Sequence, residues 1–408
     1  MATADPHPVT PMSNASPLAL LLNIGHALDH LFLLVFATAV SAIAADFGLA
    51  RWEDLMPYTV GAFIMFGVAS IPAGRLGDLW GRRAMMVIFF FGIGASSFLV
   101  AATQNAAQMA AALTVLGVFA AIYHPVGIPM LVQNAHRPGL TIGINGLAGN
   151  LGIASAALFT GLLVKFFGWR TAFVVPGAFS MLCGVLFMLL APKEAMAPAK
   201  RKRTGPELPR AVMLRIIFVM TATAVTANLI FNFLTNGNGE LLRERFRGIV
   251  EDPATLGLLL AAVYAVGSFA QIIVGRLIDK VPLKRLYLGI ALTQIPLYVL
   301  AAYSDGWTLW LLAVAFMAFT FGAIPFTDAM IVRYVDDRMR SRVSGVRLAI
   351  GLGVSALAVY ILGPVVKASG FTTLLLAMAA IASCTALFIS LLPGEAAMRP
   401  APIPAPAE

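Results

Sequence analysis

The stretch GRLGDLWGRR at residues 74–83 follows a long apolar segment, and GRLIDKVPLKR at residues 275–285 follows another. Four positions recur at an offset of 201, with Gly74, Arg75, Leu76 and Asp78 returning as Gly275, Arg276, Leu277 and Asp279. Other matches keep the same order: Phe119 and Pro125 return as Phe319 and Pro325, and Gly143 and Gly149 as Gly345 and Gly351. Self-similarity of this kind indicates that one half of the chain repeats the other.

The composition excludes an ordinary water-soluble protein. Hydrophobic residues fill 60% of the 408 positions and charged residues only 12%, whereas soluble domains carry roughly 25% charged residues. A spanning helix needs about 20 apolar residues, and twelve such helices with short connections fit this length. The alternating segments of about 10 residues that build membrane barrels are not found in the sequence. We therefore predict an all-α membrane protein of twelve transmembrane helices, arranged as two six-helix bundles.

Apolar runs place the twelve spans. They are expected at residues 18–44, 55–73, 84–103, 108–133, 140–164, 170–191, 211–235, 255–274, 285–303, 307–332, 343–366 and 372–392. The polar segment after the sixth run divides the chain nearly in two. The predicted parts are an N-terminal bundle over 1–191, a cytoplasmic linker over 192–210, a C-terminal bundle over 211–392 and a disordered Pro/Ala-rich tail over 393–408.

The formal net charge of +9 is explained by membrane topology rather than by a nucleic-acid partner. Lys and Arg concentrate in the segments that share a side of the membrane with the N-terminus, as the positive-inside rule describes. Both termini are therefore expected in the cytoplasm, with the chain in the cell (inner) membrane. Cys183 and Cys384 lie within apolar runs, so neither a disulfide framework nor metal–thiolate chemistry is expected.

The repeated motif resembles the signature of the major facilitator superfamily, which follows the second span in that family, and the resemblance extends over essentially the whole chain. Gly74 would let two helices approach closely, and Asp78 and the arginines would bridge helix ends. The resemblance implies that this network holds one state and is released during alternating access. The gating residues that it assigns are Gly74, Asp78, Gly81, Arg82, Arg83, Gly275 and Asp279. The alternative, arginines that only set topology, would not require the glycines or the aspartate.

Three further stretches resemble the fosmidomycin-resistance branch of bacterial exporters. They are GHALDH at 25–30, YHP at 123–125 and GLAGNLGIASAAL at 146–158. That branch carries a histidine with an acid in the first span, a His-Pro in the fourth and a Gly-rich stretch with Asn in the fifth. The present chain differs in detail, because its acid is Asp29 and a second histidine, His30, follows it.

Ionisable residues inside a span are expensive and usually face a cavity. His26 and His30 share one helical face with Asn23, and His124 lies at a similar depth in the fourth span. Asp29 beside these histidines is expected to accept and release a proton. The alternatives are that each histidine only bonds to a neighbouring helix, or that His26 and His30 bind a metal at i, i+4 spacing. Without further acidic or thiolate ligands, no metal is expected.

The second half carries different polar residues. Arg347 occupies the repeat position of Asn145 and needs a partner, either Asp328 or an anionic group of the substrate. A structural ion pair, or an arginine that reaches the membrane surface, is the alternative. Amides recur along the seventh span, where bonding between helices is the commoner explanation. The substrate-binding candidates are Asn23, Asn145, Asn150, Asn228, Asn232, Asp328 and Arg347.

The sequence thus predicts a secondary active transporter that moves a small organic solute by alternating access, with a proton-coupled exporter favoured. Its partners are expected to be the solute, protons and the lipid bilayer, and the chain is expected to be a monomer without cofactors. An uptake permease for a small organic anion and a non-transporting membrane sensor are the alternatives. Motifs of hydrolases, zinc proteases and phosphate-binding loops are missing from the sequence, so an enzyme is not expected.

Overall fold

The computed structural model describes residues 14, 16–50, 55–133, 135–194, 196–200, 210–251 and 253–393. Over these residues the chain is built from helices, which confirms the all-helical class. Most of the predicted linker (201–209) and nearly all of the predicted tail (394–408) lie outside the described residues. The chain divides into two compact units, Met1–Lys202 with Asp337–Gly353, and Arg203–Asp336 with Val354–Glu408.

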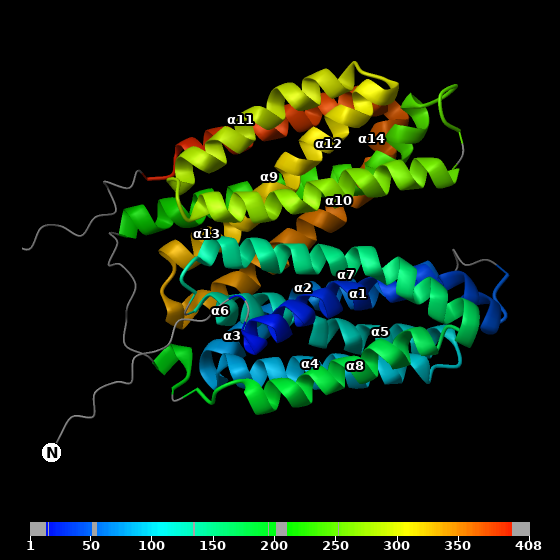
Figure 1. Ribbon diagram of the computed structural model, residues 1–408, viewed down its shortest axis with the longest axis vertical. Coiled ribbons are helices and arrows are strands. Elements are labelled where there is room, and N and C mark those ends of the chain that lie inside the picture. Colours follow the sequence, from blue (N-terminus) through cyan, green and yellow to red (C-terminus); the bar gives the residue numbers. More distant parts are fainter. Residues whose placement is uncertain are drawn as a thin grey trace, which may run out of the picture. The chain divides into compact units, whose positions relative to one another are not determined.

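The first unit contains most of the helices of the N-terminal half. They are α1 (Pro17–Asp46), η2 (Met56–Thr59), α2 (Val60–Val68), α3 (Ser70–Trp80), α4 (Arg82–Ala101), α5 (Ala106–Ala120), η3 (Tyr123–Gly127), α6 (Ile128–Val132), α7 (Pro138–Phe167), α8 (Thr171–Leu190) and η4 (Pro198–Lys200). Its later segment adds η5 (Asp337–Met339) and the start of α14 (Arg340–Ser390). Figure 1 shows α1 beside α7 and α4 beside α8, and both pairs are in contact.

The second unit contains α9 (Arg210–Arg245), α10 (Pro253–Ile278), α11 (Leu283–Ala302), α12 (Gly306–Ala323), α13 (Pro325–Tyr334) and the rest of α14. α14 is interrupted at Gly370, where φ is 74°. The N-terminal half has its equivalent at Gly168, where φ is 84° between α7 and α8. Residues other than glycine rarely adopt a positive φ. Glycine at both positions, 202 residues apart, therefore makes the same turn into the last helix of each half.

Ten helical stretches among the described residues are long and apolar enough to cross a membrane. Two predicted spans, 140–164 and 343–366, are not among the ten; they coincide with α7 and the first part of α14. Large apolar side chains are exposed outside the core, among them Phe167 at 71% and Leu189 at 73%. Water would disfavour such a surface and lipid would accept it. The structure therefore supports a multi-pass membrane protein, and the count of twelve spans remains a prediction.

The helix of the second predicted span runs past the predicted boundary at residue 73. α3 continues to Trp80, and Gly81, with φ of 106°, ends it. The apolar run stops earlier than the helix because Asp78 is buried against protein rather than exposed to lipid. Similarly, the charged segment after the seventh predicted span belongs to α9, which continues as far as Arg245.

Close helix contact in the first unit depends on Gly152. A Cβ atom added there would overlap the backbone carbonyl oxygen of Ala27, so only glycine lets α7 approach α1 at this point. This contact lies along the pair of helices that carries the site described below.

We expect Gly152→Ala to destabilise the protein by about 1–3 kcal/mol, because a backbone carbonyl has little freedom to move away. The measurement is thermal unfolding of the purified protein in detergent. Gly289→Ala is the matched control, since a Cβ on α11 at Gly289 meets nothing within 4 Å. An equal effect of the two substitutions on the melting temperature would contradict the assigned contact.

Candidate functional site

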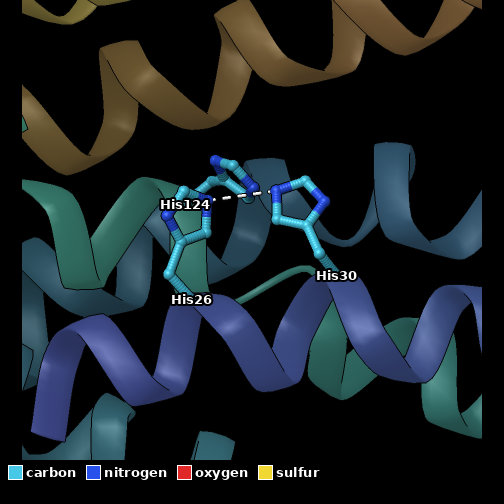
Figure 2. A group of neighbouring side chains, drawn as sticks. All are labelled: His26, His30 and His124. Carbon is cyan, nitrogen blue, oxygen red and sulfur yellow. Dashed lines mark hydrogen bonds between the residues drawn. The ribbon is translucent and has the colours of Figure 1, made fainter. Parts of the chain in front are cut away.

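Three histidines of the first unit face one another. His26 and His30 lie one turn apart on α1, and His124 reaches them from η3 (Figure 2). The ring centroids of His26 and His30 are 4.8 Å apart, and that of His124 lies 4.9 Å from the first and 5.4 Å from the second. The structure therefore brings the predicted histidine group together.

The local backbone of η3 explains how His124 reaches α1. Residues Tyr123–Gly127 form a π-helical turn between α5 and α6. Pro125 has no backbone N–H and so cannot continue a regular helical ladder. Widened turns of this kind occur mostly as single bulges and often at functional sites. The YHP sequence thus encodes both the bulge and the histidine that it carries.

Hydrogen bonds fix the orientation of the first two rings. Nδ1 of His26 lies 2.7 Å from the backbone oxygen of Asn145 on α7, which can only accept, so this nitrogen carries a proton. Nε2 of a neutral His26 is then the acceptor. Nε2 of His30 lies 3.1 Å away and donates to it. For neutral rings, these contacts place the proton of His26 on Nδ1 and that of His30 on Nε2.

A second layer of polar groups supports Asn145. Its amide nitrogen donates to Oδ1 of Asn23 and to the hydroxyl of Tyr123, both at 2.8 Å. That hydroxyl donates in turn to the backbone oxygen of Leu22 at 2.7 Å. The Tyr123 ring also stacks on His26, with centroids 4.9 Å apart and planes at 12°. Tyr123 was not predicted as a site residue, and its only signal in the sequence is its position directly before His124.

Asp29 is the acidic member of the group. Its side chain is fully buried, and neither carboxylate oxygen accepts a hydrogen bond from the described residues. Nε2 of His124 lies 3.4 Å from Oδ2 of Asp29. An ionised carboxylate without hydrogen bonds is strongly disfavoured in an apolar interior. This arrangement suits a group that takes up and releases a proton.

Gly149 provides space for the rings. A Cβ atom at this position of α7 would lie 2.7 Å from Cε1 of His26 and 2.9 Å from Cδ2 of His30. Any side chain there would push the two rings apart. Asn150, another predicted substrate-binding residue, lies half-buried on the same helix.

The second unit has amides where the first has histidines. Asn228 and Asn232 on α9 stand 202 residues after His26 and His30. The Asn228 amide donates to its own helix at the Ala224 oxygen, 2.8 Å away. The Asn232 amide donates to the Asn228 oxygen at 2.9 Å and to Oγ of Ser355 on α14 at 2.8 Å. At least one amide of this face therefore forms a hydrogen bond to a neighbouring helix.

The other two predicted binding residues of the C-terminal half belong to different units. Asp328 is buried on α13 in the second unit. Arg347 is half-buried on the first part of α14, which belongs to the first unit. Their predicted pairing stays a prediction.

The signature motif forms a buried polar network within the first unit. The Arg82 guanidinium is fully buried and donates to Oδ1 of Asp337 at 2.9 Å and to Oγ of Ser341 at 3.2 Å. Oδ2 of Asp78 accepts the backbone N–H of Arg342 at 3.0 Å. A Cβ at Gly74 would overlap the Ser341 carbonyl oxygen, so this glycine permits the close approach.

Arg83 acts on a different partner. Its guanidinium donates to the backbone oxygens of Met188 at 2.7 Å and Ala191 at 2.9 Å, which end α8. Lys284, 201 residues later, donates to the oxygens of Ser390 and Leu392 at 2.7 Å each, which end α14. Cations that cap carbonyls at helix ends are stabilising. The repeat therefore includes a cationic cap, formed by Arg83 and Lys284, which was not recognised when the two motifs were compared in the sequence.

The remaining motif residues lie near these helix ends. Oε2 of Glu194 accepts the backbone N–H of Arg83 at 3.1 Å and lies where a Cβ at Gly81 would be. Gly275 is buried near the end of α10, and Asp279 is exposed just after it. Leu283 stands in the repeat position of Arg82, so the second half lacks that arginine.

Beyond the candidate span Pro17–Val40, α1 ends in an ion pair. Oδ2 of Asp46 lies 2.8 Å from the Arg170 guanidinium, which donates to it, and 3.2 Å from the Trp169 indole nitrogen. Arg170 also lies over the Trp169 ring, 4.3 Å from its centroid. The hydrogen bond from Arg170, followed by that from Trp169, holds the pKa of Asp46 below its ordinary value.

Comparisons with known proteins agree with this arrangement. Residues 22–242 match the sequence profile of the Major Facilitator Superfamily. The solved transporter FucP, in its outward conformation, superposes with a TM-score of 0.74 at 14% identity, covering 94% of this chain and 100% of that one. At this identity the likeness concerns the fold alone.

Two curated relatives carry functional names. The chain is 25% identical to the tetracenomycin C resistance and export protein of Streptomyces glaucescens, over 62% of this chain and 44% of that one. It is 26% identical to the 4-hydroxybenzoate transporter of Pseudomonas aeruginosa, over 45% and 41%. The match therefore spans less than half the length of either relative.

The pair of Asp46 and Arg170 predicts a pH dependence. A carboxylate whose pKa is lowered in the folded state adds stability above its unfolded pKa of about 3.9, and this is lost as pH falls through the folded pKa. We expect Asp46→Asn to lower the melting temperature at neutral pH, with the difference from the unmodified protein vanishing on acidification below about pH 4. A difference that stayed constant with pH would show that Asp46 contributes no charge to stability.

Proposed function

We propose a function from one premise: the chain belongs to the Major Facilitator Superfamily, and is therefore a membrane transporter rather than an enzyme. It moves a small organic solute across the membrane by alternating access, as a proton-coupled exporter. The observation that carries the proposal is the buried Asp29 carboxylate, which accepts no hydrogen bond from the described residues and lies 3.4 Å from His124.

The surroundings of Asp29 support proton coupling. The carboxylate lies beside the histidine group, and neither of its oxygens accepts a hydrogen bond from the described residues. Protonation removes the buried charge, and deprotonation becomes favourable when water or a cationic imidazole reaches it. His124, which is 15% exposed, is the member through which such access is expected. His26 and His30 complete the proton-coupling group.

Alternating access draws on the Arg82 network. The segment Asp337–Gly353 packs within the first unit, yet it is joined at both ends to the second. Relative motion of the units must therefore break the bonds of Arg82 and Asp78 to this segment or carry the segment along. We assign the gating role to these residues, with Gly74, Gly81 and Arg83 positioning the helices, and Gly275 and Asp279 in the repeat.

The remaining parts of the proposal concern topology and solute. We propose twelve spans, bundles over 1–191 and 211–392 joined by a cytoplasmic linker, both termini in the cytoplasm, and a monomer in the inner membrane. Solute contacts are assigned to Asn23, Asn145, Asn150, Asn228, Asn232, Asp328 and Arg347. Export is supported by the named export protein among the relatives, and by the GHALDH, YHP and Gly-rich stretches typical of the fosmidomycin-resistance branch.

A second candidate is uptake of a small organic anion. Arg347 offers a planar guanidinium, which binds a carboxylate through two parallel hydrogen bonds. A relative named for 4-hydroxybenzoate, an organic anion, points the same way. The fold is the same for both candidates, and only the direction of net flux differs.

Asp29→Asn is expected to uncouple transport. In proteoliposomes with an imposed pH gradient, the unmodified protein should accumulate or expel solute against its gradient, whereas the variant should only exchange solute down its gradient. The amide has nearly the shape of the carboxyl but does not titrate. Asp46→Asn is the matched control, because Asp46 is an exposed acid on the same helix. Gradient-driven transport by Asp29→Asn would refute the assigned proton carrier.

Arg347→Lys is expected to distinguish the two candidates. Lysine keeps the charge but cannot form the paired hydrogen bonds. If the solute is an organic anion, the KM for it, measured with labelled 4-hydroxybenzoate as probe, should rise about tenfold or more. An unchanged KM, together with drug export by the variant, would reject the anion permease.

A further inference from the structure

We propose that His26, His30 and His124 form a binding site for one divalent transition-metal ion such as Zn²⁺. The sequence offered two histidines at i, i+4 spacing and favoured no metal. The structure supplies the third ligand from η3, and one nitrogen of each ring lies within 4.8 Å of the others. The inference stands on this geometry and does not depend on the proposed solute or direction.

The spacing of the ligand atoms is close to what an ion requires. Zn–N bonds are about 2.0–2.1 Å long, so two nitrogens of a tetrahedral site stand about 3.3 Å apart. The Nε2 atoms of His26 and His30 are 3.1 Å apart. His30 offers its Nε2 lone pair once its proton moves to Nδ1, which keeps the ring neutral. The ligand nitrogen of His124 lies within 4.8 Å of the other two and must move closer to reach this spacing; Figure 2 shows its ring beside the other two.

The groups behind the ligands are those of a built metal site. Metal-bound histidines usually donate their other ring nitrogen to a carbonyl or a carboxylate. Nδ1 of His26 donates to the Asn145 carbonyl oxygen. Nε2 of His124 lies 3.4 Å from the Asp29 carboxylate, so an acidic group stands beside this ring as well. The buried, otherwise unsatisfied charge of Asp29 also offsets part of the charge of a divalent cation.

The site would remain open at its fourth position. Three histidines plus one water is the ligand set of zinc sites that exchange a ligand. Imidazole also suits cobalt, nickel and copper, so selectivity would follow geometry rather than ligand type. A bound ion would occupy the same nitrogen atoms that now share the proton between His26 and His30.

The test is metal binding by the full-length protein, purified with a tag that contains no histidine. Titration with Co²⁺ should give the intense visible absorption of a four-coordinate ion at one equivalent per chain, and Zn²⁺ should displace it. His26→Gln and His124→Gln should each weaken binding by about tenfold or more, and Asp29→Asn by about 10–100-fold, as expected for a residue that orients a ligand.

His136→Gln is the matched control, because His136 is exposed on a connection outside the group; it should bind Co²⁺ like the unmodified protein. Thermal unfolding of each variant verifies that it is folded. No one-equivalent binding, the pale spectrum of an octahedral ion, or equal binding by the His26→Gln variant would overturn the site. Proton-coupled transport could persist under each of these results, so failure here is distinguishable from failure of the proposed function.

Discussion

Burial of the Asp29 carboxylate is the constraint on which the first unit depends. The side chain is inaccessible to solvent and its oxygens accept no hydrogen bond within the described part of the chain. An apolar bundle tolerates such a group only when it is protonated or faces a cation. The surrounding histidines can hold the proton or provide the cation. Asn145 on α7 orients His26, and Gly149 on the same helix leaves space for the rings. Proton transfer and metal binding are two uses of the same unsatisfied charge.

The two halves share a scaffold and differ in chemistry. Gly168 and Gly370 make the same turn, and Arg83 and Lys284 cap the same helix ends. By contrast, amides replace the histidines of α1 in the second unit, and a leucine replaces Arg82. A repeated fold can diverge in this way because helix packing depends on small residues and caps. The ionisable groups can therefore differ between the halves without changing the fold. We assign the proton-carrying role to the first half.

The apolar runs and the helical periodicity of the sequence predicted the helices and the face of α1 that carries the histidines. The hydrogen-bond partners that these side chains find on other helices could not be predicted in this way. The Asn145 carbonyl is a backbone group and has no signature in the sequence, and the Tyr123 hydroxyl depends on the π-turn of η3. Hydropathy also did not indicate that α3 continues to Trp80, because Asp78 is polar yet buried in protein.

Asp29 is tested most directly as the proton carrier by proton release when the purified protein binds a transported solute in weakly buffered solution, followed with a pH-sensitive dye. We expect release by the unmodified protein near neutral pH and none by Asp29→Asn, with solute binding retained. Equal proton release by the two proteins would show that the proton resides elsewhere, and would contradict the assignment of coupling to the buried carboxylate of the first unit.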